Sequence, residues 1–85
     1  MQIINVIPTN DYKLILQYSN NEVRIYDVKP LLEKGIFKIL KDKKIFYTVR
    51  PRLDSVEWPN IFDDPYCSEI DISPESLYTN SVLYE

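Results

Sequence analysis

The sequence contains no histidine and only one glycine among its 85 residues. Without histidine, the chain lacks the usual general base near neutral pH, the Ser–His and Cys–His nucleophile pairs and the commonest metal ligand. A single glycine, Gly35, cannot form a glycine-rich loop around a phosphate, which excludes P-loop and dinucleotide-binding sites. These absences predict a protein that is not an enzyme and that has no metal site or cofactor.

Cysteine and long apolar runs are equally scarce. Cys67 is the only cysteine and cannot form an internal disulfide, as is typical of the reducing cytoplasm. No run approaches the roughly 18 apolar residues of a membrane-spanning helix, and the N-terminus lacks the pattern of a signal peptide. The apolar fraction of 45% is that of a packed globular chain. We therefore expect a cytoplasmic protein with a single domain over residues 1–85.

Charge is divided unevenly along the chain, although the net charge is only −3. Residues 1–52 hold all ten lysines and arginines and five acids, whereas residues 53–85 hold eight acids and no base. Six bases interleaved with aromatic residues could meet phosphates and stack on nucleic-acid bases. These candidates are Lys38, Lys41, Lys43, Lys44, Arg50 and Arg52. Alternatively, the two halves lie together and partly neutralise each other, and the lysines form a solvated face.

The first third of the chain predicts three strands. Residues 3–7 are rich in β-branched residues and end at Pro8. Residues 12–18 and 22–27 alternate between apolar and polar side chains, and the Asn20-Asn21 pair between them favours a tight turn. In the first alternating segment, one face is predicted to carry Tyr12, Leu14, Leu16 and Tyr18.

The middle of the chain predicts short helical turns and two further strands. Pro30 would begin a turn over residues 31–34 that Gly35 ends, Phe37 and Leu40 would pack inward from a second turn, and Asp42 would cap a third. Residues 46–49 are expected to form a strand ended by Pro51. In the returning strand, residues 55–58, alternation places Val56 and Trp58 in the core and Glu57 outside.

The last third contains a segment without periodicity, residues 60–68. Its apolar residues either fold down over the core or form an exposed contact surface. In the second interpretation the partner-binding residues are Ile61, Phe62, Asp63, Asp64 and Tyr66. A short strand is expected at residues 70–72, followed by a helix with Ser73 as N-cap, Pro74 at its first position, and Leu77 and Tyr78 as anchors.

The order of these pieces resembles a known family. The matching positions are residues 26–32, Phe37, Leu40, Phe46, the Trp58-Pro59 strand end and residues 71–78. Together they are similar to the small bacterial proteins catalogued as domain of unknown function 2442. The chain departs from the family pattern after Asn60, where the usual glycine is absent and residues 61–69 are inserted.

The resemblance implies an α+β fold, with a small antiparallel β-meander of about five short strands and short helices on one side. It assigns no catalytic residues. Some members are encoded beside a small partner in pairs that look like toxin–antitoxin modules. Others carry a helix-turn-helix region after this domain, which is not expected here because the chain ends at Glu85.

These observations predict a non-enzymatic protein-interaction module, in its most specific version an antitoxin-like partner of a neighbouring gene product. Nucleic-acid binding through residues 38–52 is one alternative. Self-association is another, with the edge strand at residues 3–7 pairing two copies into a homodimer. An enzyme would have to pair Glu57 with Asp63, Asp64 or Asp71 for acid–base work. No small-molecule ligand and no membrane association are predicted.

Overall fold

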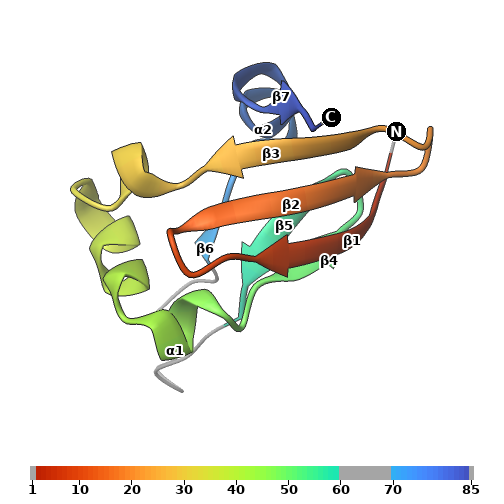
Figure 1. The fold of residues 1–85 in the computed structure, drawn as a ribbon. Coiled ribbons are helices and arrows are strands. Elements are labelled where there is room, and N and C mark those ends of the chain that lie inside the picture. The colour runs from red at the N-terminus through yellow and green to blue at the C-terminus, as the bar shows by residue number, and fades with distance from the viewer. Residues whose placement is uncertain (1, 60–69, 85) are drawn as a thin grey trace.

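The structure is a computed structural model that describes residues 2–59 and 70–84. Its strands form two antiparallel sheets joined by short helices (Figure 1). The first sheet has the order β1-β2-β3-β7, with bounds Ile3–Pro8, Lys13–Tyr18, Val23–Asp27 and Val82–Leu83. The second has the order β4-β5-β6, with bounds Arg50–Arg52, Ser55–Trp58 and Ile70–Asp71. The α+β class with an antiparallel meander is thus confirmed, and its strands are divided between two sheets.

The predicted meander is formed by β1, β2 and β3. Alternation buries Leu14, Leu16 and Tyr18 on one face of β2, as expected. Asn21 turns the chain between β2 and β3 with φ of 72°, a left-handed conformation that asparagine tolerates better than most residues. Local side-chain chemistry and the alternating pattern therefore specify the same hairpin.

Short helices follow the meander: η1 (Lys29–Leu31), η2 (Gly35–Lys41) and α1 (Lys43–Phe46). Gly35 begins η2 with φ of 48° instead of ending the preceding turn, and that first turn lies earlier than the predicted 31–34. The predicted cap is confirmed, because the Asp42 carboxylate accepts a hydrogen bond from the Lys44 backbone N–H at 3.0 Å.

The predicted strand over residues 46–49 is wrong. The helix capped by Asp42 continues to Phe46, whose ring is fully buried, so the core contact comes from a helix end. The strand begins at Arg50 and contains Pro51, which was expected to end it. Proline is tolerated there because β4 is an edge strand and needs no outward N–H.

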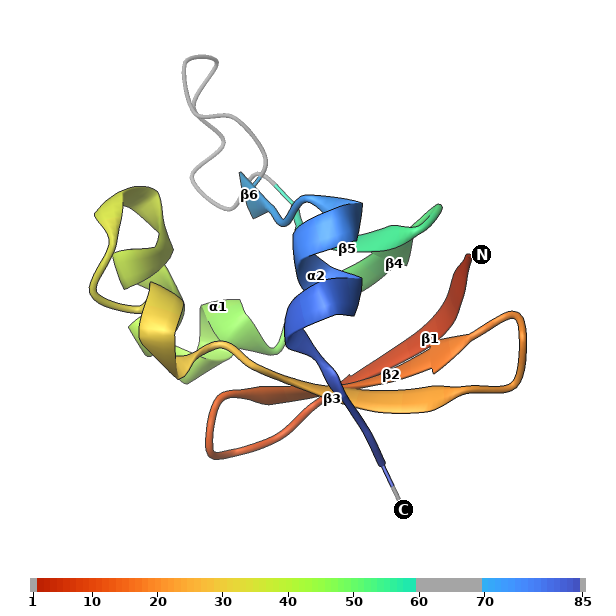
Figure 2. The same ribbon diagram turned by 90° about the horizontal axis from the view of Figure 1, so that it is seen from above.

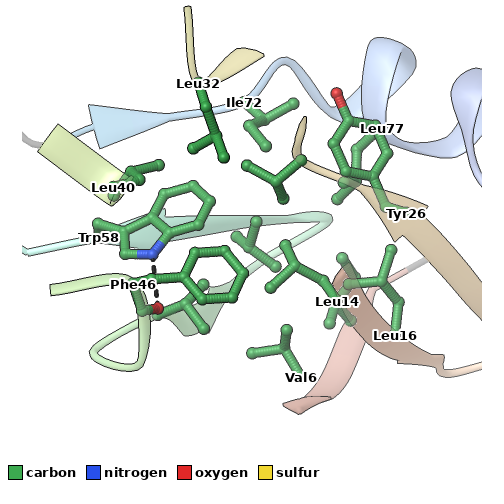
Figure 3. Packing of buried hydrophobic residues seen from close by; sticks show 14 of the residues in the cluster. Val6, Leu14, Leu16, Tyr26, Leu32, Leu40, Phe46, Trp58, Ile72 and Leu77 are labelled. Carbon is green, nitrogen blue, oxygen red and sulfur yellow. Dashed lines mark hydrogen bonds between the residues drawn. The ribbon is translucent and has the colours of Figure 1, made fainter. Parts of the chain in front are cut away.

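The core lies between the two sheets and is closed by α2 (Pro74–Asn80) and the short helices (Figure 3). Trp58 is at its centre and has no exposed surface, and its indole N–H donates to the Phe46 carbonyl at 2.9 Å. Leu77 of α2 is also fully buried. Ser73 occupies the N-cap position of α2 as predicted, although its side chain makes no capping hydrogen bond.

The two sheets and α2 leave one face of the first sheet uncovered. Figure 2 shows α2, β4 and β5 on the same side of β1–β3, and none of the described segments lies over the other side. That uncovered face is turned toward the viewer in Figure 1.

Candidate protein-interaction surface

An apolar row crosses the uncovered face of the first sheet. In the strand register Ile7 is opposite Ile15, Ile15 is opposite Ile25, and Ile25 is opposite Val82. Directly opposed residues share a face, and this row alternates with the buried residues of β2. Ile7 and Val82 at its two ends are 50% and 64% exposed. We call Ile7, Ile15, Ile25 and Val82 the apolar row.

Polar and charged residues flank the apolar row. On one side Lys13 is opposite Asp27 in the strand register, and the Lys13 Nζ lies 3.6 Å from the Asp11 carboxylate, so two acids and one base border the row there. On the other side Gln17 is opposite Val23, and the Tyr84 backbone N–H donates to the Val23 carbonyl at 2.8 Å. A half-buried apolar centre with exposed apolar ends and a polar rim is the composition of many protein interfaces. It has little attraction for a phosphate backbone.

The six predicted nucleic-acid-binding residues are spread over η2, α1 and β4. Arg50 Nε and Arg52 Nη1 lie 3.2 and 3.4 Å from the two carboxylate oxygens of Glu57. Lys41 Nζ lies 2.7 Å from Glu33, and Lys43 Nζ is 5.6 Å from the centre of the Tyr12 ring. Four of these six basic side chains therefore have a partner within the chain, which lowers the positive electrostatic potential of this segment. Nucleic-acid binding stays a prediction.

Glu57 lies on the face of β5 opposite to Val56 and Trp58, as alternation predicts, but it is not exposed. Its side chain is only 7% exposed and lies between two half-exposed arginines of the neighbouring strand. The expected exposure is wrong because a carboxylate can be buried where cations hold it. The carboxylate pairing considered for an enzyme involves Asp71, whose side chain, like Asp63 and Asp64, lies outside what the structure describes.

The structure describes some of the other predicted sites and not others. The candidate contact residues 61–64 and 66 lie outside the described residues. The edge strand β1 is partly engaged, because the Ile3 backbone N–H donates to the Leu53 carbonyl at 2.8 Å. Among the described residues no group of three or more His, Cys, Asp or Glu side chains is arranged to hold a metal ion. Nor does any helix in residues 2–59 and 70–84 have the length and apolarity to cross a membrane.

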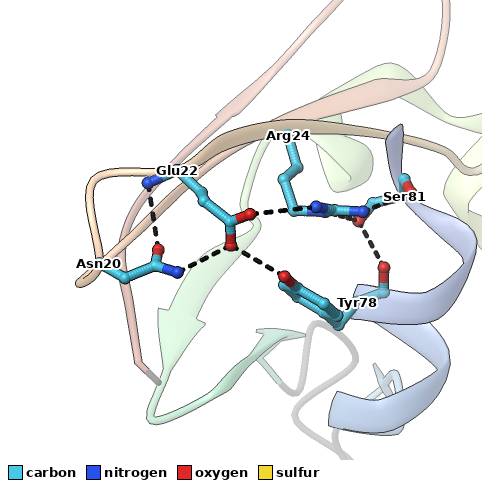
Figure 4. A network of polar contacts seen from close by, with 5 residues as sticks. All are labelled: Asn20, Glu22, Arg24, Tyr78 and Ser81. Carbon is cyan, nitrogen blue, oxygen red and sulfur yellow. Dashed lines mark hydrogen bonds and ion pairs between the residues drawn. The ribbon is translucent and has the colours of Figure 1, made fainter. Parts of the chain in front are cut away.

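A polar network fixes β7 beside β3 and so completes the apolar row (Figure 4). Arg24 donates from Nε to the Ser81 hydroxyl at 2.7 Å and from Nη2 to the Ser81 carbonyl at 2.9 Å. The Tyr78 hydroxyl donates to the Glu22 carboxylate at 2.9 Å. Sequence reasoning missed Glu22, Arg24 and Ser81, since the only signal was that Glu22 and Arg24, two residues apart, share a strand face.

Comparison with known proteins identifies the family. The family model described as a protein of unknown function (DUF2442) matches residues 3–82. The chain belongs to the DUF2442 family. This confirms the resemblance found in the sequence. No curated protein and no solved structure matches the chain.

In this DUF2442 chain, Glu22 is expected to make the free energy of unfolding decrease as the pH falls into the acid range. Hydrogen bonds from Asn20 and Tyr78, assisted by the Arg24 charge, hold the pKa of Glu22 below its usual value. A carboxyl with a lowered folded pKa stabilises the fold above its unfolded pKa of about 4.3, and this contribution is lost as the pH falls through the folded pKa. Glu22→Gln should therefore destabilise the domain at neutral pH and converge with the wild type in acid.

Urea denaturation of both proteins at several pH values below 7 measures this difference. Asp54→Asn is the matched control, because Asp54 is an exposed carboxylate in the β4–β5 turn. Its curve should run parallel to that of the wild type. A constant difference between Glu22→Gln and the wild type at all pH values would contradict the prediction.

Proposed function

We propose that this DUF2442 chain is a non-enzymatic protein-interaction module that binds a different protein on the uncovered face of its first sheet. The observation that carries the proposal is the apolar row, in which four β-branched side chains line up across every strand of that sheet. Isolated apolar residues are normal on protein surfaces, whereas a contiguous patch is typical of a contact site.

A stable interface needs a larger area than the apolar row alone. A standard interface takes about 800 Å² from each protein, which is roughly one seventh of the 5370 Å² that this chain exposes. The apolar row must therefore be joined by its flanks, including Val23 and Tyr84, in the buried area. Tyr84 is 56% exposed and supplies an aromatic ring of the kind that is enriched in interfaces.

Charge favours a different protein over a second copy. The chain has a net charge of −3, so two copies brought together repel each other, and the rim of the face itself carries the acids Asp11 and Asp27 beside Lys13. The gene pairs known for some family members make the product of the neighbouring gene the first partner to test. Residues 61–66 are a second candidate contact surface for the same partner.

The test replaces the two exposed ends of the apolar row. Ile7→Lys/Val82→Lys places two charges on the face at positions where the side chains are already half or more exposed, so the fold should be retained. Affinity for the co-expressed neighbouring gene product, measured by calorimetry, should fall at least about tenfold, since a buried unpaired charge opposes association. Tyr47→Lys is the matched control, because Tyr47 is 45% exposed and lies at the C-cap of α1, away from the face.

Three results would decide the proposal. Loss of binding in Ile7→Lys/Val82→Lys but not in Tyr47→Lys supports it. Equal affinity of both variants and the wild type contradicts it. If light scattering shows that the chain alone forms a dimer which Ile7→Lys/Val82→Lys dissociates, the face binds a second copy and the proposed different partner is wrong.

A further inference from the structure

A shallow hollow lies on the other side of the first sheet, between the end of β2, the β4–β5 turn and the beginning of α2. Figure 2 shows α2 and the β4–β5 hairpin standing side by side over that end of the sheet. The hollow has a volume of about 490 Å³, within the range of about 300–1,000 Å³ common for ligand sites. It is lined by Tyr18, Asp54, Ser73, Pro74, Glu75 and Tyr78. We call it the acidic hollow.

The charge of the acidic hollow is negative and not neutralised from within. Asp54 and Glu75 are both exposed, and neither forms an ion pair with any residue that the structure describes. The nearby Arg24 lies 4.2 Å from the centre of the Tyr78 ring, but its guanidinium is held by Glu22 and Ser81. An anionic ligand would be repelled by the two carboxylates, and a cation would be attracted.

A buried hydroxyl in the wall of the acidic hollow provides an independent observation. Tyr18 is 1% exposed, and its hydroxyl has no hydrogen-bond partner within the described part of the chain. Buried hydroxyls are nearly always hydrogen-bonded, so an orphan one beside a hollow indicates a group that binds there. The Tyr18 ring is held in place by an edge contact with Tyr78, with centroids 5.4 Å apart and an interplanar angle of 85°.

We infer that the acidic hollow binds a basic side chain, a lysine or an arginine, of another polypeptide. Asp54 and Glu75 supply the opposite charge, and the Tyr18 hydroxyl oxygen accepts an N–H from the cation. The exposed part of the Tyr78 ring packs against the aliphatic stem, as long basic side chains prefer. Both lysine and arginine offer this chemistry, and the experiment distinguishes them.

This inference does not depend on the proposed function. Tyr18 belongs to the buried face of β2, whereas the apolar row lies on the opposite face. A partner bound to the apolar row therefore leaves the acidic hollow open, and either surface can be disabled without touching the other. Failure of one proposal leaves the other standing.

The test is a nitrogen-15 NMR titration of the whole chain with three capped amino acids. The probes are the N-acetyl, N-methylamide derivatives of lysine, arginine and norleucine, the last being an uncharged analogue of lysine. We expect saturable shifts at the lining residues, with a Kd on the order of millimolar for at least one basic probe, because the site is open to solvent. Whichever basic probe binds more tightly identifies the side chain. Norleucine should cause no saturable shift.

Two variants and one control locate the binding. Asp54→Asn/Glu75→Gln removes both charges with little change of shape, and binding should weaken about fivefold, the effect of two exposed ion pairs. Tyr18→Phe keeps the ring and removes the hydroxyl, and binding should weaken about twofold to threefold. Asp27→Asn/Glu33→Gln removes the same charge from other exposed positions and should leave the Kd unchanged.

Each outcome bears on the inference. Shifts confined to the lining residues, lost in Asp54→Asn/Glu75→Gln and kept in the control, support it. An equal loss in the control would mean that the basic probes respond only to overall charge, and the site would be refuted. Equal binding of norleucine, or no saturable shift with any probe, would also overturn it. An unchanged Kd in Tyr18→Phe would likewise contradict it, because the hydroxyl is part of the proposed site.

Discussion

Trp58→Ala is expected to lower the free energy of unfolding by about 3–5 kcal/mol, the usual cost of truncating a large buried ring. Trp58 has no exposed surface and packs against Phe46, with ring centroids 6.1 Å apart. The substitution also removes the donor of the hydrogen bond to the Phe46 carbonyl. A domain of 85 residues has a total stability on the order of 5 kcal/mol, so the variant should keep no more than about 2 kcal/mol and should be only marginally stable.

Urea denaturation followed by far-ultraviolet circular dichroism measures this loss without relying on tryptophan fluorescence. Trp58→Phe should cost less than Trp58→Ala, because it retains an aromatic ring in the core. The remaining loss, about 2 kcal/mol, comes from the smaller ring and from the Phe46 carbonyl, which has lost its hydrogen-bond donor. Tyr47→Ala is the matched control: this ring also contacts Phe46 but is 45% exposed, and its loss should cost about 1 kcal/mol or less. A Trp58→Ala protein with an unchanged urea midpoint would refute the structural role and make Trp58 a binding-site candidate.

The meander could be predicted because its information is local. Alternation over residues 12–18 and 22–27 identifies the buried face of each strand, and the Asn20-Asn21 turn joins them. Because successive residues point to opposite faces, the same pattern leaves Ile15 and Ile25 on the uncovered side. The three-strand meander, which depends on residues close together in the sequence, could therefore be predicted correctly.

The strand expected at residues 46–49 failed because two local signals disagree. The β-branched and aromatic side chains there favour a strand, whereas Asp42 caps a helix that reaches Phe46. The outcome is decided by packing, since the helix end places the Phe46 ring against Trp58. Propensity cannot register a contact between residues that far apart.

Both candidate sites depend on contacts between distant parts of the chain. The apolar row needs β7 beside β3, and the Arg24–Ser81 hydrogen bonds that support this pairing join residues 57 positions apart. The acidic hollow likewise brings Tyr18, Asp54 and Glu75 together from three separate elements. Residue type and spacing carry no information on such pairings in a single sequence, so neither surface could be predicted.

Glu57→Ala is expected to lower the free energy of unfolding by about 2 kcal/mol, which is large for a charged residue in so small a domain. The loss is that of charge-assisted hydrogen bonds to Arg50 and Arg52. It stays below the 3–5 kcal/mol typical of a fully buried pair, because the two arginine side chains are 55% and 56% exposed and keep contact with solvent. Urea denaturation measures the change.

Salt distinguishes this electrostatic role of Glu57 from simple packing. Arg50 and Arg52 are two residues apart on β4 and share a face, and the Glu57 carboxylate offsets the repulsion between these two like charges. Glu57→Gln, which preserves the volume, should therefore be destabilised at low ionic strength and regain part of its stability as salt screens the repulsion, whereas the wild type should lose stability slightly. Asp54→Asn, in the adjacent turn, should show neither effect. If Glu57→Gln were as stable as the wild type at low salt, the carboxylate would not be what holds β4 to β5.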